Sequence, residues 1–584
     1  MTAESHCRRG DELARQNQIP AAVAEFQAAI KLQPRYALAH FFLGTALRII
    51  GQLEAATESY RQAVELKPDY TQAWEKLGEV LLDRRQCAQA AVACQRAVVL
   101  SPTALNYANL GSALGGADQL DKSLAAMNKA VELAPHWSDV QKGLGSINYW
   151  CGRQADAIAA FRRAIELDRS NSAAHSMLLY TMLFHGGFSP EQLLHEHIQW
   201  AAQHTKNIIP LPPPANDRKI DRRLRVGYVS PNFRTQAVVS FILPVLENHD
   251  AWEVEMFCYS DVIAPDAWTQ RAKKPVDEWR DTANLSHEQL AHLIRKDKID
   301  ILVDLTGHIG DGRLQAFAYK PAPIQITWIG YQATTGLPAI DYFLTDAWAD
   351  PPGQTEKYFV EHLFRLPETF FCYMSPPHPP DVGPLPAMSR GYITFGSFNN
   401  LAKVTPGTLD LWARLLLVVP DSRLLLMTPA SEQVEQRLRA IFTTAGISAD
   451  RLELVHRVPL LEYLERYNQI DIALDPVPFN GHTTTCDAAW MGVPTVMLAG
   501  EIYAYRYGGS VLRNLGLGDL IAASEDDYIR IAADLAGDRN RLSEIRRRLR
   551  STMAASPITD AAGFTHNLEQ AYRQMWRTCC ESQS

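Results

Sequence analysis

Hydroxyl and basic residues follow an apolar segment late in the chain, where they could bind an anion. Residues 470–476 (IDIALDP) predict a buried strand. An Asn-Gly turn comes next, and then His482, Thr483 and Thr484 open a helix-like run. The amide groups and the dipole of a helix N-terminus attract phosphate groups, and threonine hydroxyls add further donors.

Asp487 lies about one turn further into the same run, where its carboxylate could accept hydrogen bonds from ribose hydroxyls. The segment therefore favours a cradle for a nucleotide diphosphate. An ordinary threonine-capped helix of an α/β domain would explain the same residues equally well. Features elsewhere in the chain are needed to choose between the two interpretations.

A second polar cluster follows another apolar strand pattern. In residues 395–406 (FGSFNNLAKVTP) a loop carries Asn400 and Lys403 before Thr405 and Pro406 start a helix. Lys403 would lie at the carboxyl end of a strand, where its ammonium group could neutralise a diphosphate that leaves during group transfer. The alternative interpretation is a surface lysine in a loop.

Composition and cysteine usage exclude several classes of function. The 584-residue chain is 47% hydrophobic and 21% charged, and its formal net charge of −8 argues against a nucleic-acid surface. Nine scattered cysteines without C-x-x-C spacing indicate reduced thiols rather than disulfides or a zinc site. The sequence shows neither a signal-peptide core nor a run of about 18 apolar residues. We expect a soluble, cytoplasmic protein with no metal, no membrane contact and no nucleic-acid partner.

The first third of the chain is periodic. Glycine recurs at positions 10, 44, 78, 111 and 145, alanine at 29, 63, 97, 130 and 164, and a larger residue at 26, 60, 94, 127 and 161. Steps of 33 or 34 residues are typical of tetratricopeptide repeats, each a pair of antiparallel helices. We expect five repeats over residues 3–171, stacked into an α superhelix with a groove for polypeptide substrates or partner proteins. Such arrays can also form homodimers, which stays an open alternative.

Residues 172–214 predict a helical bridge that ends in a proline-rich linker. A glycine break at Gly186 separates its two helical segments. The second segment carries His195, His197 and His204, which resemble a metal cluster. Their offsets do not bring all three to one helix face at coordination distance, so we expect solvated surface histidines.

From residue 222 short apolar strands alternate with helices, and the pattern restarts near residue 390 after a proline-rich stretch. We expect two α/β lobes over residues 222–385 and 390–584, each a parallel sheet covered by helices on both faces. Ligands of such folds bind at the carboxyl ends of the strands, here in the cleft between the lobes. Neither a G-x-G-x-x-G sequence after a first strand nor a Walker A motif is found.

The order of these motifs resembles the O-GlcNAc transferase and SPINDLY family of tetratricopeptide-repeat protein O-glycosyltransferases. The motifs are LTGH (Leu305–His308), KPAPIQ (Lys320–Gln325), SFNNLAK (Ser397–Lys403), NGHTTTCD (Asn480–Asp487), MGVP (Met491–Pro494) and LEQAYRQMW (Leu568–Trp576). The similarity covers the chain from Gly10 to Trp576. A match of this length in this order is highly specific for the family and less specific for the donor sugar.

The resemblance implies two Rossmann-like lobes of the GT-B glycosyltransferase type, with the nucleotide held mainly by the second lobe, the first lying on the acceptor side. It implies an inverting, metal-independent transfer of a sugar to Ser/Thr hydroxyls of intracellular proteins. The nucleotide-sugar would be a co-substrate, UDP-GlcNAc being the leading donor, and no cofactor is expected. Carried over by motif, the diphosphate contacts would be Asn400, Lys403, Thr483 and Thr484, with His482 nearby and Asp487 on the ribose.

Two places depart from the family pattern. The family's GYPGT turn reads GYQATTG here (Gly330–Gly336) and loses its proline, and the second place bears on catalysis. Where family members usually carry a histidine in a segment like SPDFRxHSV, this chain has SPNFRTQAVV, with Gln236 in that place. Glutamine can form hydrogen bonds but cannot accept a proton at neutral pH. His308, after the DILVDL strand, is then the remaining titratable catalytic candidate of the first lobe. Its alternative interpretation is a packing or helix-capping histidine.

Several functions therefore stay open beside the UDP-GlcNAc transferase. The LTGH and SFNNLAK spellings lean towards the SPINDLY branch, whose plant members resemble GDP-fucose users, whereas His482 is typical of the GlcNAc branch. A second alternative, favoured by Gln236, is a catalytically weak adaptor that only binds nucleotide. A third is a transferase that acts on a small glycan or a lipid-linked acceptor.

Overall fold

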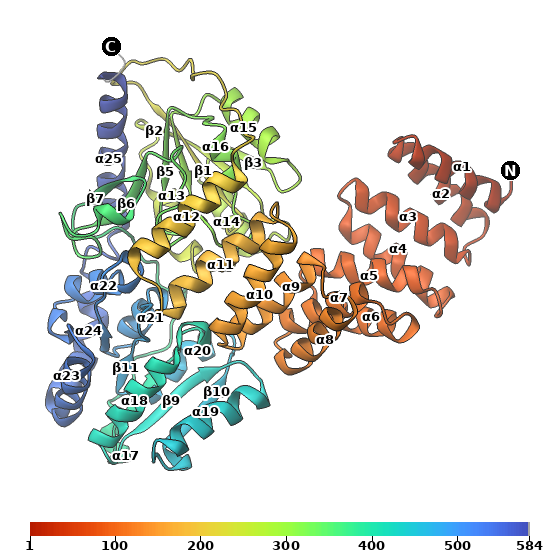
Figure 1. Cartoon of the computed structure of the whole chain (residues 1–584). Coiled ribbons are helices and arrows are strands. Elements are labelled where there is room, and N and C mark those ends of the chain that lie inside the picture. The colour runs from red at the N-terminus through yellow and green to blue at the C-terminus, as the bar shows by residue number, and fades with distance from the viewer. Residues whose placement is uncertain (582–584) are drawn as a thin grey trace. The chain divides into compact units, whose positions relative to one another are not determined.

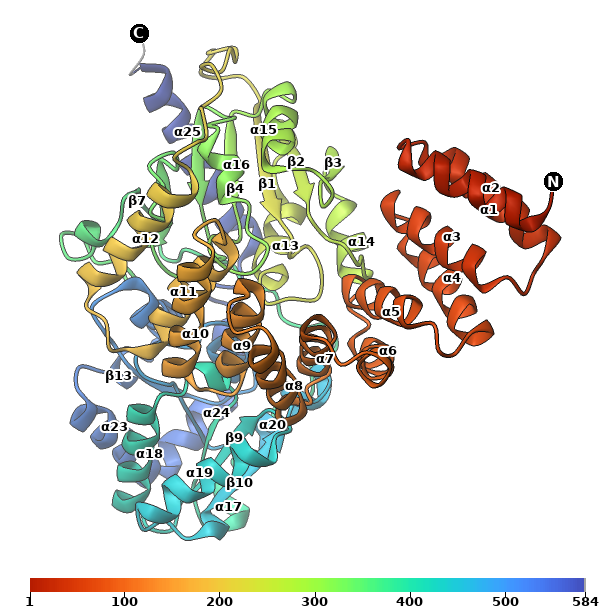
Figure 2. The same ribbon diagram turned by 45° about the vertical axis from the view of Figure 1, so that its right-hand side comes forward.

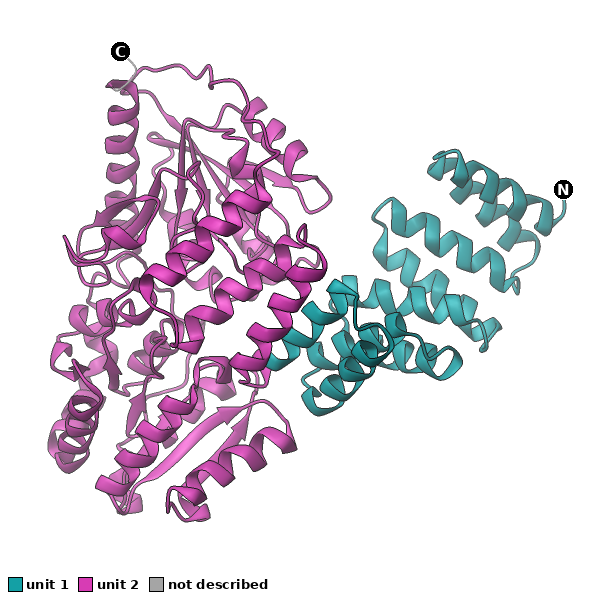
Figure 3. Cartoon of the chain, viewed as in Figure 1, with its two compact units in different colours: residues 1–148 teal, residues 149–584 magenta. Residues whose placement is uncertain are grey.

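The computed structural model describes residues 1–581 (Figure 1). The chain forms two compact units, divided in sequence between Asn148 and Tyr149 (Figure 3). The first unit consists of paired helices, and the second holds the end of the repeats and two parallel sheets. No helix within residues 1–581 is long and apolar enough to cross a membrane.

Antiparallel helix pairs make up the first unit, as the repeat pattern predicts. Its helices are α1 (Ala3–Arg15), α2 (Ile19–Leu32), α3 (Ala37–Ile49), α4 (Leu53–Leu66), α5 (Thr71–Asp83), α6 (Cys87–Leu100), α7 (Ala104–Gly116), α8 (Leu120–Leu133) and most of α9 (Ser138–Trp150). A Cβ atom at Gly10 would lie 2.6 Å from the Phe26 ring, and one at Gly44 would lie 2.9 Å from the Tyr60 ring. The periodic glycine and the periodic large residue therefore face each other where the two helices of a repeat touch.

The last helix of the repeats and the two helices of the bridge lead to the sheets. They are α10 (Gln154–Leu167), α11 (Ser172–His185) and α12 (Pro190–His204). Helix α11 ends at Gly186 in the left-handed conformation with φ of 73°, which confirms the predicted break. Ser189 caps α12 in a reciprocal pair of hydrogen bonds with Gln192.

The prediction of solvated histidines on α12 is wrong for two of the three. His197 is fully buried, with ring nitrogens 2.6 Å from the Leu193 carbonyl oxygen and 2.7 Å from the Tyr331 hydroxyl. His204 is also buried and lies 3.1 Å from His175 on α11. The two residues lie on a face of α12 that packs inward, whereas His195 is exposed.

The first lobe is a parallel sheet with strand order β3-β2-β1-β4-β5-β6-β7. Its strands are β1 (Leu224–Ser230), β2 (Val254–Ser260), β3 (Glu278–Asp281), β4 (Ile301–Asp304), β5 (Ile324–Thr327), β6 (Tyr342–Asp346) and β7 (His362–Leu366). The helices between them are α13 (Val239–Asn248), α14 (Ala267–Lys273), α15 (His287–Lys296) and α16 (Leu314–Ala318). Strand β4 is buried along its whole length, as expected of a sheet covered on both faces.

The second lobe is a parallel sheet with strand order β10-β9-β8-β11-β12-β13. Its strands are β8 (Thr394–Ser397), β9 (Arg423–Thr428), β10 (Leu452–His456), β11 (Ile472–Leu474), β12 (Thr495–Leu498) and β13 (Ile521–Ala522). Its helices are α17 (Pro386–Arg390), α18 (Pro406–Val418), α19 (Glu432–Thr444), α20 (Leu460–Arg466), α21 (Thr483–Trp490), α22 (Gly508–Asn514), α23 (Glu525–Gly537) and α24 (Arg539–Ala554). The predicted succession of helical repeats and two α/β lobes is confirmed.

The last helix, α25 (Ala561–Glu581), returns to the first lobe (Figure 2). The Tyr572 hydroxyl lies 3.2 Å from that of Tyr228 on β1, and Glu569 bonds the ring of His249 at 2.8 Å. In the connection between the lobes, the Met374 amide donates to the Ser240 carbonyl of α13. The two lobes are thus joined both by this connection and by α25.

Candidate active site

Two loops of the second lobe meet at the carboxyl ends of the paired strands β8 and β11. Asn399, in the first loop, donates to Asp475 at 3.3 Å and accepts from the Thr484 hydroxyl at 2.9 Å. The Gly481 amide donates to the other oxygen of Asp475 at 3.0 Å. A Cβ atom at Gly481 would lie 2.5 Å from the Thr484 hydroxyl and 2.6 Å from Asp475, so this turn requires glycine.

Lys403, at the end of the short 3₁₀ turn η2 (Leu401–Lys403), is held between these loops. Its Nζ donates to the Asn480 carbonyl at 2.8 Å and lies 4.7 Å from the centre of the Phe479 ring. Burial lowers the pKa of Lys403 to about 8, although Asp475 raises it. No carboxylate within residues 1–581 forms an ion pair with Lys403. At neutral pH the site therefore holds a mostly protonated ammonium group with no anion in direct contact.

The N-terminus of α21 lies beside this lysine, and no side chain caps it. The ring of His482, the residue before the helix, stacks on Phe241 of the first lobe at 4.4 Å and 11°. Its Nε2 is buried and has no hydrogen-bond partner in the described part of the chain. Burial, and secondarily the charge of Lys403, lowers the pKa of His482 to about 3, so its ring is neutral. Unsatisfied amides, an ammonium group and an orphan imidazole nitrogen together favour an anionic ligand.

The remaining predicted diphosphate contacts lie on the same two loops. The side chain of Asn400 accepts from the Ala402 amide at 3.1 Å and caps η2. Thr483 is partly exposed in the first turn of α21, whereas the Thr484 hydroxyl is engaged with Asn399. Sequence reasoning did not assign a role to Asn399, although the Asn-Asn pair of the SFNNLAK motif marks the place.

The predicted ribose contact, Asp487, is buried, and each of its two carboxylate oxygens accepts a hydrogen bond. One oxygen accepts from the Tyr373 hydroxyl at 2.6 Å, and the other accepts from the Tyr463 hydroxyl at 3.0 Å. Burial raises the pKa of Asp487 to about 6, and the two tyrosine hydroxyls counteract the rise. Sequence analysis could not identify either tyrosine, because both are far from Asp487 along the chain.

His308, the catalytic candidate of the first lobe, lies apart from the residues around Lys403. It is 1% exposed, with one ring nitrogen 2.8 Å from the Thr335 carbonyl oxygen and the other 3.2 Å from the Ser176 hydroxyl of α11. Its ring packs edge-on against Trp200 at 4.6 Å. Burial lowers the pKa of His308 well below its ordinary value. This environment suits the packing histidine that the sequence left as the alternative.

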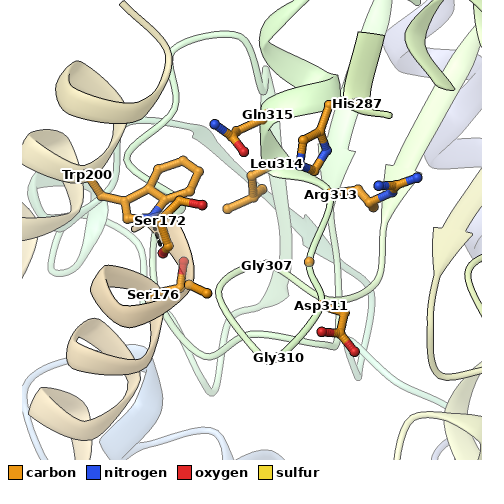
Figure 4. Close-up of a pocket in the computed structure, with 12 residues that line it drawn as sticks. Ser172, Ser176, Trp200, His287, Gly307, Gly310, Asp311, Arg313, Leu314 and Gln315 are labelled. Atoms are coloured by element: carbon orange, nitrogen blue, oxygen red, sulfur yellow. Dashed lines mark hydrogen bonds between the residues drawn. The ribbon is translucent and has the colours of Figure 1, made fainter. Parts of the chain in front are cut away.

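The loop that begins beside His308 lines a cavity of about 250 Å³. Ser176 and Trp200 line one side of it, and His287, Arg313 and Gln315 line another (Figure 4). The cavity is lined by polar and apolar groups close to the carboxyl end of β4. It therefore lies at the edge of the first lobe where ligands of parallel sheets bind.

Gln236 is exposed in the loop between β1 and α13. The same α13 carries Phe241 in its first turn, and Phe241 stacks on His482 of the second lobe. The chain segment with Gln236 thus leads directly into the contact between the lobes.

A helix of the last repeat also reaches this site. The side-chain amide of Gln154, the first residue of α10, donates to the Ala402 carbonyl at 2.7 Å. Arg437 of α19 donates to the Cys151 carbonyl at 2.6 Å. The loop that carries Lys403 is therefore supported by the end of the repeat array.

Comparison with known proteins agrees with this architecture. The sequence model of glycosyl transferase family 41 matches residues 175–374 and 386–568, and a tetratricopeptide-repeat model matches residues 7–70, 50–104 and 109–172. The solved structure of an O-GlcNAc transferase mutant from Thermobaculum terrenum superposes with a TM-score of 0.84 at 34% identity. The match covers 88% of this chain and 98% of that one, and it supports the predicted GT-B type fold.

Plant proteins are similar over the same region. The rice protein named a probable UDP-N-acetylglucosamine–peptide N-acetylglucosaminyltransferase SPINDLY is 42% identical over 432 residues, which are 73% of this chain and 46% of that protein. The Arabidopsis thaliana protein of the same name is 39% identical over 429 residues, 72% of this chain and 46% of that protein. This chain spans about half the length of these relatives. The family model matches well over half of the residues, and the chain belongs to glycosyl transferase family 41.

Proposed function

We propose that this protein transfers a sugar from a nucleotide-sugar to Ser/Thr hydroxyls of intracellular proteins, with UDP-GlcNAc as the leading donor. The observation that carries the proposal is Lys403, whose ammonium group has no carboxylate partner among residues 1–581 and lies beside the uncapped N-terminus of α21. The names of the plant relatives support UDP-GlcNAc as the donor. Tetratricopeptide repeats support a polypeptide acceptor.

In an inverting transfer the acceptor oxygen bonds to the anomeric carbon from the side opposite the diphosphate. The bond from that carbon to the diphosphate oxygen breaks, and the nucleoside diphosphate leaves with the electron pair. Lys403 and the amides of α21 would stabilise the negative charge that develops on the leaving oxygen. We expect no metal requirement, because these groups already supply positive charge at the diphosphate.

The acceptor proton needs no strong base in this scheme. Gln236 cannot accept it, and His308 has both ring nitrogens engaged. With a well-stabilised leaving group the proton can depart late, to an oxygen of the leaving diphosphate or to water, after the bond to the acceptor is largely formed. Stabilisation of the leaving diphosphate would then supply most of the rate enhancement.

Thermal unfolding with nucleotides tests the proposal. Wild type and Lys403→Ala would each be heated with UDP, GDP, UDP-GlcNAc and GDP-fucose. A ligand at about 100 times its Kd adds about 2.7 kcal/mol to the unit that binds it. We expect a rise with UDP and UDP-GlcNAc that is lost in Lys403→Ala. A rise with the GDP ligands alone would favour the fucosyltransferase, and no rise with any nucleotide would refute the transferase.

The second candidate is an adaptor that binds nucleotide without turnover, and Gln236 in place of the family histidine favours it. Release of UDP from UDP-GlcNAc, measured with and without an unstructured Ser/Thr-rich protein, separates the two. Sugar incorporated into that protein, checked by mass spectrometry, supports the transferase. Nucleotide binding with neither hydrolysis nor transfer supports the adaptor.

A further inference from the structure

Asp487 is held by two tyrosine hydroxyls that come from different parts of the second unit. Tyr373 belongs to the connection between the lobes and bonds one carboxylate oxygen at 2.6 Å. Tyr463 belongs to α20 and bonds the other oxygen at 3.0 Å. Burial raises the pKa values of both tyrosines well above the ordinary value of 10, so both remain hydrogen-bond donors.

Tyr373 is the more firmly held of the two. It is 2% exposed, and its own amide donates to the Ile558 carbonyl at 2.6 Å. The next amide, that of Met374, donates to Ser240 of α13. The Tyr373 ring also lies against the Phe241 ring of α13. Tyr373 therefore cannot leave Asp487 without a rearrangement of the connection between the lobes.

Tyr463 can move more easily. It is partly exposed, and it lies on α20, a short helix whose first residues, Leu460 and Leu461, are exposed at 46% and 50%. Its hydroxyl has a second partner at 2.9 Å, the hydroxyl of Tyr467, to which it can remain bonded after leaving Asp487. A ligand hydroxyl could thus replace Tyr463 at Asp487 without leaving a buried polar group unsatisfied.

We propose that Tyr463 occupies, in the nucleotide-free protein, the place of a ribose hydroxyl on Asp487, while Tyr373 holds the other oxygen in both states. Tyr373 is then a positioning residue that acts through Asp487, and Tyr463 is a competitor that the nucleotide displaces. The inference rests on the proposed nucleotide site and adds the mechanism by which Asp487 is presented to the ribose.

The proposal predicts different outcomes for the same substitution, Tyr to Phe, at the two tyrosines. Tyr463→Phe removes the competitor, so nucleotide affinity at pH 8 should rise about two- to tenfold. Tyr373→Phe should give no such gain. It removes a hydrogen bond that favours the carboxylate, so the pKa of Asp487 should rise above the value of about 6. As the pH is lowered, the nucleotide affinity of Tyr373→Phe should therefore begin to fall at a higher pH than that of the wild type.

Isothermal titration from pH 5 to 8.5 with UDP and GDP, and with their 2′,3′-dideoxy analogues, tests this proposal. The effects of both substitutions should be present with the ribonucleotide that binds and absent with its dideoxy analogue. Tyr505→Phe is the matched control, because it removes a partly buried hydroxyl that donates to the Leu183 carbonyl and does not touch Asp487. Melting curves without nucleotide verify that each variant is folded.

Equal losses of affinity in both variants, with ribonucleotide and dideoxy analogue alike, would overturn the inference while leaving the proposed function intact. If nucleotide affinity of Tyr373→Phe began to fall at the same pH as in wild type, the positioning role of Tyr373 would be overturned. No binding of any nucleotide by the wild type would instead refute the proposed function, and the inference with it.

Discussion

Replacing Lys403 with methionine should stabilise the nucleotide-free protein while it weakens nucleotide binding. The pKa of Lys403 falls from its ordinary value of 10.5 to about 8 on burial. At 1.36 kcal/mol per pKa unit this corresponds to about 3 kcal/mol, which solvent screening of the partly exposed side chain reduces to about 1–3 kcal/mol. Methionine keeps most of the volume, and the Asn480 carbonyl retains the Tyr507 hydroxyl at 2.8 Å.

The sign of this effect depends on pH. Below pH 8 the lysine is charged in the folded and the unfolded protein, so the full cost of burying the charge is present. As the pH rises from about 8 to 10.5, the folded protein loses the proton first and the cost disappears. The advantage of Lys403→Met should therefore be largest near pH 7 and should vanish above pH 10.5.

Urea unfolding at pH 7 and pH 10.5, followed for the transition that nucleotide shifts, measures the stability difference. Titration with the nucleotide that stabilises the wild type measures binding, and sugar transfer measures turnover. We expect turnover to fall by a factor of about 10² to 10³, as for the loss of one donor to a developing charge. A variant that is less stable at pH 7 but binds nucleotide normally would refute this reasoning, because Lys403 would then be a structural residue.

Three further substitutions separate packing from chemistry. Gly481→Ala should abolish the thermal shift with nucleotide and lower the free energy of unfolding by about 1–3 kcal/mol, because the added Cβ would overlap Thr484 and Asp475. Normal nucleotide binding by this variant would contradict the requirement for glycine in the turn. His308→Ala should cost about 2–4 kcal/mol in urea unfolding but leave the nucleotide Kd of the folded protein unchanged. If His308→Ala were as stable as the wild type but had no turnover, His308 would be a catalytic residue. Gln236→Ala should change nucleotide Kd less than about twofold in titration, since the side chain is exposed, and a loss above tenfold would place it at the nucleotide.

The repeat pattern predicted the architecture well, because side chains that pack in the buried core must recur at regular spacing along the chain. The repeat glycines could be recognised in the sequence, because glycines such as Gly10 and Gly44 must fit against the rings of Phe26 and Tyr60. Strands β3, β7 and β13 are the hardest to recognise from sequence, because they lie at sheet edges and β13 has only two residues. Strand β3 (EWRD) has no fully buried residue, so it carries no apolar pattern to recognise.

The candidate site was predictable only in part. Glycine turns and polar loops after strands marked Lys403 and His482, because local geometry determines their positions. The partners of Asp487 were missed, since Tyr373 is 114 residues away in sequence and no local pattern links them. His308 has the sequence context of a catalytic group, yet its contacts with Ser176 and Trp200 come from helices far earlier in the chain.

The hydrogen bond from Gln154 to the Ala402 carbonyl limits how the protein can be recombined. Repeat arrays are otherwise interchangeable parts, so chimaeras with foreign repeats are an obvious route to new acceptor proteins. A chimaera joined at residue 172 would discard α10 and leave the Ala402 carbonyl, next to Lys403 in η2, without this donor. A junction at residue 148 would keep α10, and with it the donor to the Ala402 carbonyl, in the same unit as the lobes.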